Sequence, residues 1–77
     1  MAFYATFGTG RPYAGHYVKV ETDDEEEARE VMFSAHGDKW AFLYNEEEGI
    51  EQVQKWDLKL LAVLRKNEFG NFKPISS

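Results

Sequence analysis

The chain contains no cysteine and only two histidines among its 77 residues. Without cysteine, it has no disulfide bonds, zinc–thiolate sites or thiol nucleophiles. The two histidines, His16 and His36, do not have the spacing of metal ligands on a helix, and no nucleophile motif is present. No apolar run approaches the roughly 20 residues that span a bilayer. The sequence therefore predicts a protein that is not an enzyme, has no catalytic residues, holds no metal or cofactor, and does not enter a membrane.

The length of the chain and its lack of cysteine also indicate the number of domains and the compartment. A chain of 77 residues has room for one small domain. Its first residues, MAFYATFGTGRPY, lack the basic start and the long apolar region of a signal peptide. The absence of cysteine fits a reducing compartment. We therefore expect a cytoplasmic protein.

The net charge of −5 is unevenly distributed. Residues 1–20 carry two basic side chains and no acidic one, whereas residues 21–51 carry twelve acidic and two basic side chains. The remaining residues carry five basic and two acidic side chains. An acidic surface repels the phosphate backbone of nucleic acids, so direct coating of DNA is not expected.

Residues 22–36 have the pattern of an amphipathic helix. Thr22 and Glu25 form a predicted capping box at its start. Gly37 is placed to end it, because glycine adopts positive φ without steric cost. Four apolar residues recur at i, i+3, i+4 and i+7, which predicts one buried stripe. These are Ala28, Val31, Met32 and Ala35.

Three strands are predicted around this helix. Residues 2–7 form the first, with Phe3, Ala5 and Phe7 on one side, and residues 16–21 form the second, with Val18 and Val20 inward. A long glycine-rich loop, residues 8–15, joins them.

Residues 39–44 form the third predicted strand. Trp40, Phe42 and Tyr44 fall on one face of it, and Ala41 and Leu43 on the other. Both faces are apolar, which favours a central position in the sheet. Because the main helix covers only one face, the other must meet a second helix, the tail, a ligand or another subunit. We expect a homodimer that buries this face.

The C-terminal half is less regular. Asn45 is placed to cap a short helix. Residues 58–64 suit either a helix or a strand, and Asp57 as a break and the need for a fourth strand favour the strand. Residues 66–77 resemble a flexible tail. The predicted fold is an α+β two-layer sandwich formed by residues 1–65: a small, mostly antiparallel sheet of about four strands in the order ββαβ, short helix, β, with one main helix packed on it.

The glycine-rich loop and its neighbours are candidates for an anion site. Arg11, Tyr13 and Lys19 give this acid-free region a donor-rich chemistry, which suits an anionic ligand that bears a base. Arg29 leaves the helix on a neighbouring flank. The loop lacks the glycine spacing of a phosphate-binding motif, so its glycines also fit simple turns, and Arg29 also fits a surface pair with a glutamate. The predicted ligand-binding residues are Gly8, Gly10, Arg11, Tyr13, Tyr17, Lys19 and Arg29.

An acidic protein-docking surface is the alternative. The acidic cluster at residues 21–30 fits a solvated helix start, or a mimic of DNA that occupies a nucleic-acid-binding cleft. Phe33 lies beside the buried stripe, so it either widens the core or touches a partner. Trp40 likewise fits either the core or a stacking platform. The predicted partner-binding residues are Glu26, Glu27, Glu30, Phe33 and Trp40.

The sequence also resembles a group of small phage- and prophage-encoded proteins. The resemblance covers roughly the first two-thirds of the chain and rests on a TFGxG start, a YV strand, an ARxxM helix and a GxxWAFxY segment. In this chain those positions are Thr6, Phe7, Gly8, Gly10, Tyr17, Val18, Ala28, Arg29, Met32, Gly37, Trp40, Ala41, Phe42 and Tyr44. The resemblance implies an accessory protein in the cytoplasm of a bacterial host, of the kind that often counters host defences.

Three functions follow as hypotheses. The first is a binder that sequesters an anionic, nucleotide-like host ligand. The second is an acidic protein inhibitor that docks on a host nucleic-acid enzyme, such as a CRISPR or restriction effector. The third is a structural or regulatory phage component without a ligand.

Overall fold

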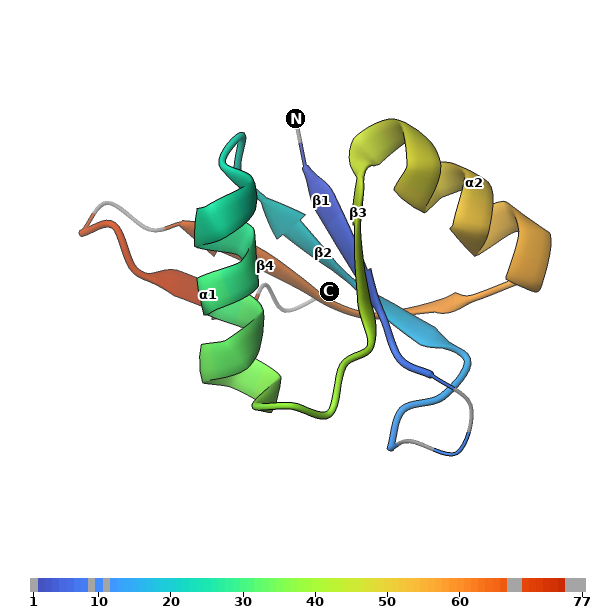
Figure 1. Ribbon diagram of the computed structural model, residues 1–77. Coiled ribbons are helices and arrows are strands. Elements are labelled where there is room, and N and C mark those ends of the chain that lie inside the picture. The colour runs from blue at the N-terminus through green and yellow to red at the C-terminus, as the bar shows by residue number, and fades with distance from the viewer. Residues whose placement is uncertain (1, 9, 11, 67–68, 75–77) are drawn as a thin grey trace.

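The computed structural model describes residues 2–8, 10, 12–66 and 69–74 (Figure 1). They form one sheet and two helices. In chain order the elements are β1 (Phe3–Thr6), β2 (His16–Glu21), α1 (Glu25–His36), β3 (Phe42–Asn45), α2 (Glu46–Trp56), β4 (Lys59–Lys66) and β5 (Phe72–Pro74).

The strands lie in the order β3-β1-β2-β4-β5. The pairs β1–β2, β1–β3 and β4–β5 are antiparallel, and β2–β4 is parallel. A parallel pair needs a long crossover, which the chain from α1 to α2 supplies. The predicted α+β sandwich with a mostly antiparallel sheet is thus confirmed, with β5 as an additional strand.

The core lies between α1 and one face of the sheet. Ala5 of β1, Val18 of β2 and Met32 of α1 are fully buried and belong to one cluster. Leu64 of β4 joins them. Because side chains alternate along a strand, the neighbouring residues face the other way. The predicted inward residues of the first two strands are confirmed.

The start of α1 differs from the predicted capping box. Asp24 is the N-cap, and its Oδ1 accepts hydrogen bonds from the backbone N–H of Glu26 and Glu27. The Thr22 hydroxyl instead donates to Glu27 Oε1 at 2.6 Å. The prediction was wrong because Asp24, two residues later, offers an equally good cap and leaves Thr22 in a side-chain bond.

The end of α1 follows the prediction. Gly37 has a φ of 59°, and its N–H donates to the carbonyl of Phe33 at 2.9 Å. Within the predicted stripe, Ala28 and Met32 are fully buried and Val31 partly, but Ala35 is exposed. Ala35 therefore lies outside the core.

The third strand is shorter than predicted and lies at an edge. β3 begins at Phe42 and, of the strands that the structure describes, pairs with β1 alone, so the predicted central position was wrong. Trp40 lies before the strand and packs against the core on the α1 side, whereas Phe42 and Tyr44 share the opposite face with Tyr4. The predicted common face fails because strand alternation does not extend back to Trp40.

The second face of β3 meets α2. Asn45 caps this helix as predicted, and its Oδ1 accepts from the N–H of Glu48 at 2.8 Å. α2 lies beside β1 and β3 on the side away from α1, and its buried Gly49 lies against Tyr4. Because α2 covers this face, the reason for expecting a homodimer is removed, and the homodimer stays an untested prediction.

The strand at residues 58–64 is confirmed as β4, which runs from Lys59 to Lys66. Asp57 ends α2 in the left-handed conformation, as the predicted break requires. The expected flexible tail at residues 66–77 was wrong for Phe72–Pro74, which form β5 on β4. Residues 67–68 and 75–77 lie outside the described residues.

Candidate functional site

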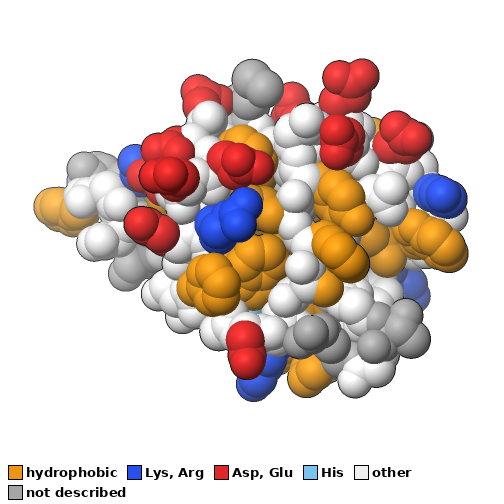
Figure 2. All heavy atoms as spheres, in the orientation of Figure 1, with side chains coloured by type: hydrophobic (Ala, Val, Ile, Leu, Met, Phe, Trp, Pro, Cys, Tyr) orange, Lys and Arg blue, Asp and Glu red, His pale blue; other side chains and the backbone are white. Residues whose placement is uncertain are grey.

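The acidic first turns of the two helices lie at the same end of the molecule. α1 begins with Glu25, Glu26 and Glu27, and α2 begins with three glutamates in residues 46–48. Figure 1 shows both helices starting at the end where β3 finishes, and Figure 2 shows acidic side chains along this end. Negative charge stabilises a helix N-terminus, so each helix favours its own acids. Together they form an acidic ridge.

Exposed aromatic rings lie farther along α1, β3 and α2. Phe33 of α1 is 54% exposed, Phe42 of β3 is 59% exposed and Trp56 of α2 is 63% exposed. Figure 2 shows hydrophobic side chains over both helices, below the acidic end. Exposed aromatics of this size are typical of surfaces that bind another molecule.

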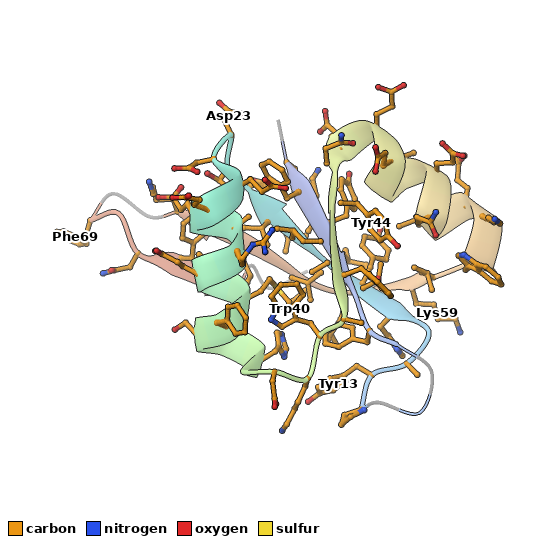
Figure 3. All side chains as sticks on the ribbon, in the orientation of Figure 1. Tyr13, Asp23, Trp40, Tyr44, Lys59 and Phe69 are labelled. Carbon is orange, nitrogen blue, oxygen red and sulfur yellow. The ribbon has the colours of Figure 1, made fainter. Side chains whose placement is uncertain are left out.

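The rings form two groups, one on each side of β3 (Figure 3). On the α1 side, the rings of Phe33 and Trp40 meet edge to face with 5.2 Å between centroids. The indole N–H of Trp40 is buried without a hydrogen-bond partner among the described residues. On the α2 side, the rings of Phe42 and Tyr44 lie 6.2 Å apart.

The rings on the α2 side border a groove of about 410 Å³. It runs between the β1–β2 loop, β3 and the end of α2. The Trp56 indole N–H donates to Gln52 Oε1 at 3.0 Å, which fixes one wall. The lining residues are Thr6, Phe7, Gly8, Ala14, Gly15, Phe42, Tyr44, Gln52, Trp56 and Leu58. None of them is a lysine or an arginine, so these residues supply no charged donor for a phosphate.

The predicted ligand-binding residues do not line one pocket. Tyr17 and Lys19 lie on the face of β2 opposite the α1 core, where the rings of Tyr17 and Tyr4 are 5.7 Å apart. Arg29 belongs to α1 on the other side of the sheet. The assumed neighbourhood was wrong because the sheet separates α1 from these two side chains.

The loop residues of that prediction also separate. Gly8 lines the groove, and Gly10 has a φ of 82°, as a turn glycine does. Tyr13 turns toward the end of α1 (Figure 3). Arg11 lies outside the described residues.

Tyr13 joins a cluster of three rings. Its centroid is 5.6 Å from that of Phe7 and 5.8 Å from that of His36, and Phe7 and His36 are 5.4 Å apart. Tyr13 has a φ of 65°, which is uncommon for a residue other than glycine. Burial, together with the positive charge of Lys39, lowers the pKa of His36. The cluster anchors the β1–β2 loop to α1.

Most of the predicted partner-binding residues share one surface. Glu26, Glu30 and Phe33 line a shallow hollow together with Arg29. Glu27 instead points toward β4, where its Oε2 lies 2.9 Å from Lys66 Nζ. The hydrogen bond from Thr22 and the contact with Lys66 lower the pKa of Glu27. Glu27 is thus the residue of the acidic ridge whose carboxylate binds Thr22 and Lys66 of the same chain.

The sequence did not single out Trp56. It follows Val53 by three residues, a spacing that places both on one helix face and suggests burial. The position of α2 on the sheet decides instead that Trp56 is 63% exposed and lines the groove beside β3.

Other kinds of site find no support in the described part of the chain. No group of three His, Cys, Asp or Glu side chains there is placed to hold a metal ion. Neither α1 nor α2 is long and apolar enough to cross a membrane. In comparisons with protein-family models, curated proteins and solved structures, the chain matches none.

Proposed function

We propose that this protein is a non-enzymatic binding protein that docks on a basic partner protein through its acidic ridge and the exposed rings of α1 and β3. The observation that carries the proposal is the meeting of both acidic helix starts at one end of the molecule, with exposed Phe33 in the same shallow hollow as Glu26 and Glu30. Acidic charge steers a basic partner and selects its orientation, and buried rings supply most of the binding energy.

The resemblance to phage and prophage proteins supplies the setting. A protein of that kind acts in the cytoplasm of a bacterial host, and a counter-defence role fits an inhibitor. Host enzymes that bind nucleic acids present basic surfaces. A CRISPR or restriction effector is therefore the class of partner that we propose.

The test measures how tightly the purified protein binds a purified CRISPR or restriction effector. Two matched pairs of substitutions are compared with the parent protein. Glu26→Gln with Glu47→Gln removes two charges from the acidic ridge, where both side chains are exposed. Asp38→Asn with Asp57→Asn removes the same charge near the ends of the helices. The ridge pair should weaken binding about tenfold or more, and the control pair should change it little. Equal effects of the two pairs would mean that only net charge matters, and would contradict a defined docking face.

A second function is favoured by the groove beside Phe42 and Trp56. Aromatic walls and the Gln52 amide suit a planar ligand that stacks and forms hydrogen bonds. Sequestration of a nucleotide-like host ligand thus remains a proposal, but its predicted residues do not converge. Excess absorbance at 260 nm in protein purified from infected cells, lost in Trp56→Ala, would favour it over docking. Purification without ligand or partner would favour a structural component.

A further inference from the structure

β3 presents an open edge of the sheet. It is the first strand in the sheet order, and among the described strands it pairs only with β1. Its outer side is therefore not hydrogen-bonded to any described strand. Alternate residues of an edge strand point their N–H and C=O groups away from the sheet, where another strand can bind them. Figure 1 shows β3 in front of the strands β1 and β2, between α1 and α2.

The sequence of β3 has few of the features that prevent an edge strand from pairing with another strand. Edge strands are commonly blocked by lysine, proline or a bulge. β3 has the sequence Phe-Leu-Tyr-Asn, with neither lysine nor proline, and Phe42 is exposed. Its short length of four residues is the one protective feature that it has. Four residues are enough to pair with a short extended segment.

Aromatic rings lie on both faces of the sheet next to β3, where the side chains of an added strand would contact them. Successive side chains of a strand point to opposite faces. One set would lie over Phe33 and Trp40 on the α1 side, and the other over Phe42 and Tyr44 on the α2 side. An added strand would therefore contact apolar surface on both faces.

The negative charge around β3 favours a basic segment as the added strand. Glu46, Glu47 and Glu48 follow β3 directly, and the hollow that contains Phe33 is lined by three acidic side chains, Glu25, Glu26 and Glu30, against one basic side chain, Arg29. Lysine and arginine side chains would place their stems on the rings and their charges beside these acids. A second copy of this chain carries the same net charge of −5 and lacks that complementarity.

We infer that β3 binds an extended, lysine- or arginine-rich segment of the partner as an added strand of the sheet. The inference rests on the proposed function, since it names the part of the basic partner that the acidic ridge and the rings receive. Backbone hydrogen bonds along β3 hold the segment, and the rings and acids on either side select its side chains.

The test uses two blocked seven-residue peptides and the full chain labelled for amide NMR. One peptide alternates lysine and valine. The other alternates lysine and proline, which keeps the charge but prevents a β-ladder. The lysine–valine peptide should bind about tenfold more tightly, shift the amide signals of β3 and slow their hydrogen exchange. Phe42→Lys, which adds a charge to the exposed edge and removes a ring, should weaken this peptide about tenfold, and it should weaken the lysine–proline peptide less, because that peptide loses only charge attraction.

Three outcomes would overturn the inference. Equal affinity for both peptides, with shifts confined to the acidic helix starts, would remove strand pairing but leave the proposed docking function intact. If neither peptide binds, the result would count against both strand pairing and the proposed docking function. Dilution-dependent shifts of β3 without peptide, with a dimer in sedimentation, would show that a second copy occupies the edge.

Discussion

Gly49 of α2 lies directly against Tyr4 of β1. A Cβ atom at position 49 would lie 2.5 Å from both Cβ and Cγ of Tyr4, closer than real side chains approach. Tyr4 is buried, and burial, followed by the negative charge of Glu46, raises the pKa of its hydroxyl. The glycine that weakens α2 as an isolated helix is thus what lets the helix dock on the sheet.

Gly49→Ala should therefore destabilise the protein, by about 1–3 kcal/mol, because the added methyl group overpacks the contact with Tyr4. Helix propensity alone predicts the opposite, a gain of about 1 kcal/mol. Urea denaturation measures the difference, and Gln54→Ala at an exposed position of the same helix is the control. A more stable Gly49→Ala variant would show that α2 does not sit on Tyr4.

Met32→Ala should cost about 2–5 kcal/mol, because Met32 is fully buried between α1 and the sheet. In a domain of this size that is a large share of the total stability. Ser34→Ala, on the exposed side of the same helix, should change stability by less than about 0.5 kcal/mol. Coincident thermal melts of Met32→Ala and the parent would refute this helix register.

Asp24→Ala should lower stability by about 1 kcal/mol, since it leaves the N–H groups of Glu26 and Glu27 without their cap. Glu25→Ala removes the same charge from the first turn without removing the cap, so it should cost less. Chemical denaturation of the two variants compares them at equal net charge. Equal losses would assign the effect to charge near the helix start instead of capping.

Stability should fall between pH 7.5 and about pH 5.5, in part through His36. Its pKa is lower in the folded protein than in the unfolded chain, so the unfolded chain takes up the proton first as pH falls below about 6.5. His36→Phe keeps a ring beside Phe7 and Tyr13 but removes this titration, so its melting temperature should depend less on pH.

Two carboxylates with lowered pKa values, Glu21 and Glu27, do not titrate in the pH range used for His36. Hydrogen bonds lower the pKa of Glu21, through Arg65, and of Glu27, through Thr22, so both contribute stability that is lost only as pH falls below about 4.5. An unchanged pH dependence in His36→Phe would remove the role given to His36.

Most of the elements, though not β5, followed from local sequence. Alternation predicted β2 and the burial of Val18 and Val20, and Asn45 predicted the start of α2. Gly37 predicted the end of α1. These features depend on residues within a few positions along the chain, where backbone sterics and hydrogen bonding act without reference to the rest of the fold.

The positions of the elements were decided only by tertiary structure. The two apolar faces of β3 fit a central strand equally well, and α2 on the second face is what allows an edge position. Which residues meet in the candidate site also depended on the placement of the helices and strands. Arg29 and Lys19 were expected together but lie on opposite sides of the sheet, whereas Phe33 and Trp40 meet across a turn. Strand order and helix placement arise from packing between residues distant in sequence, a free energy that no local pattern contains.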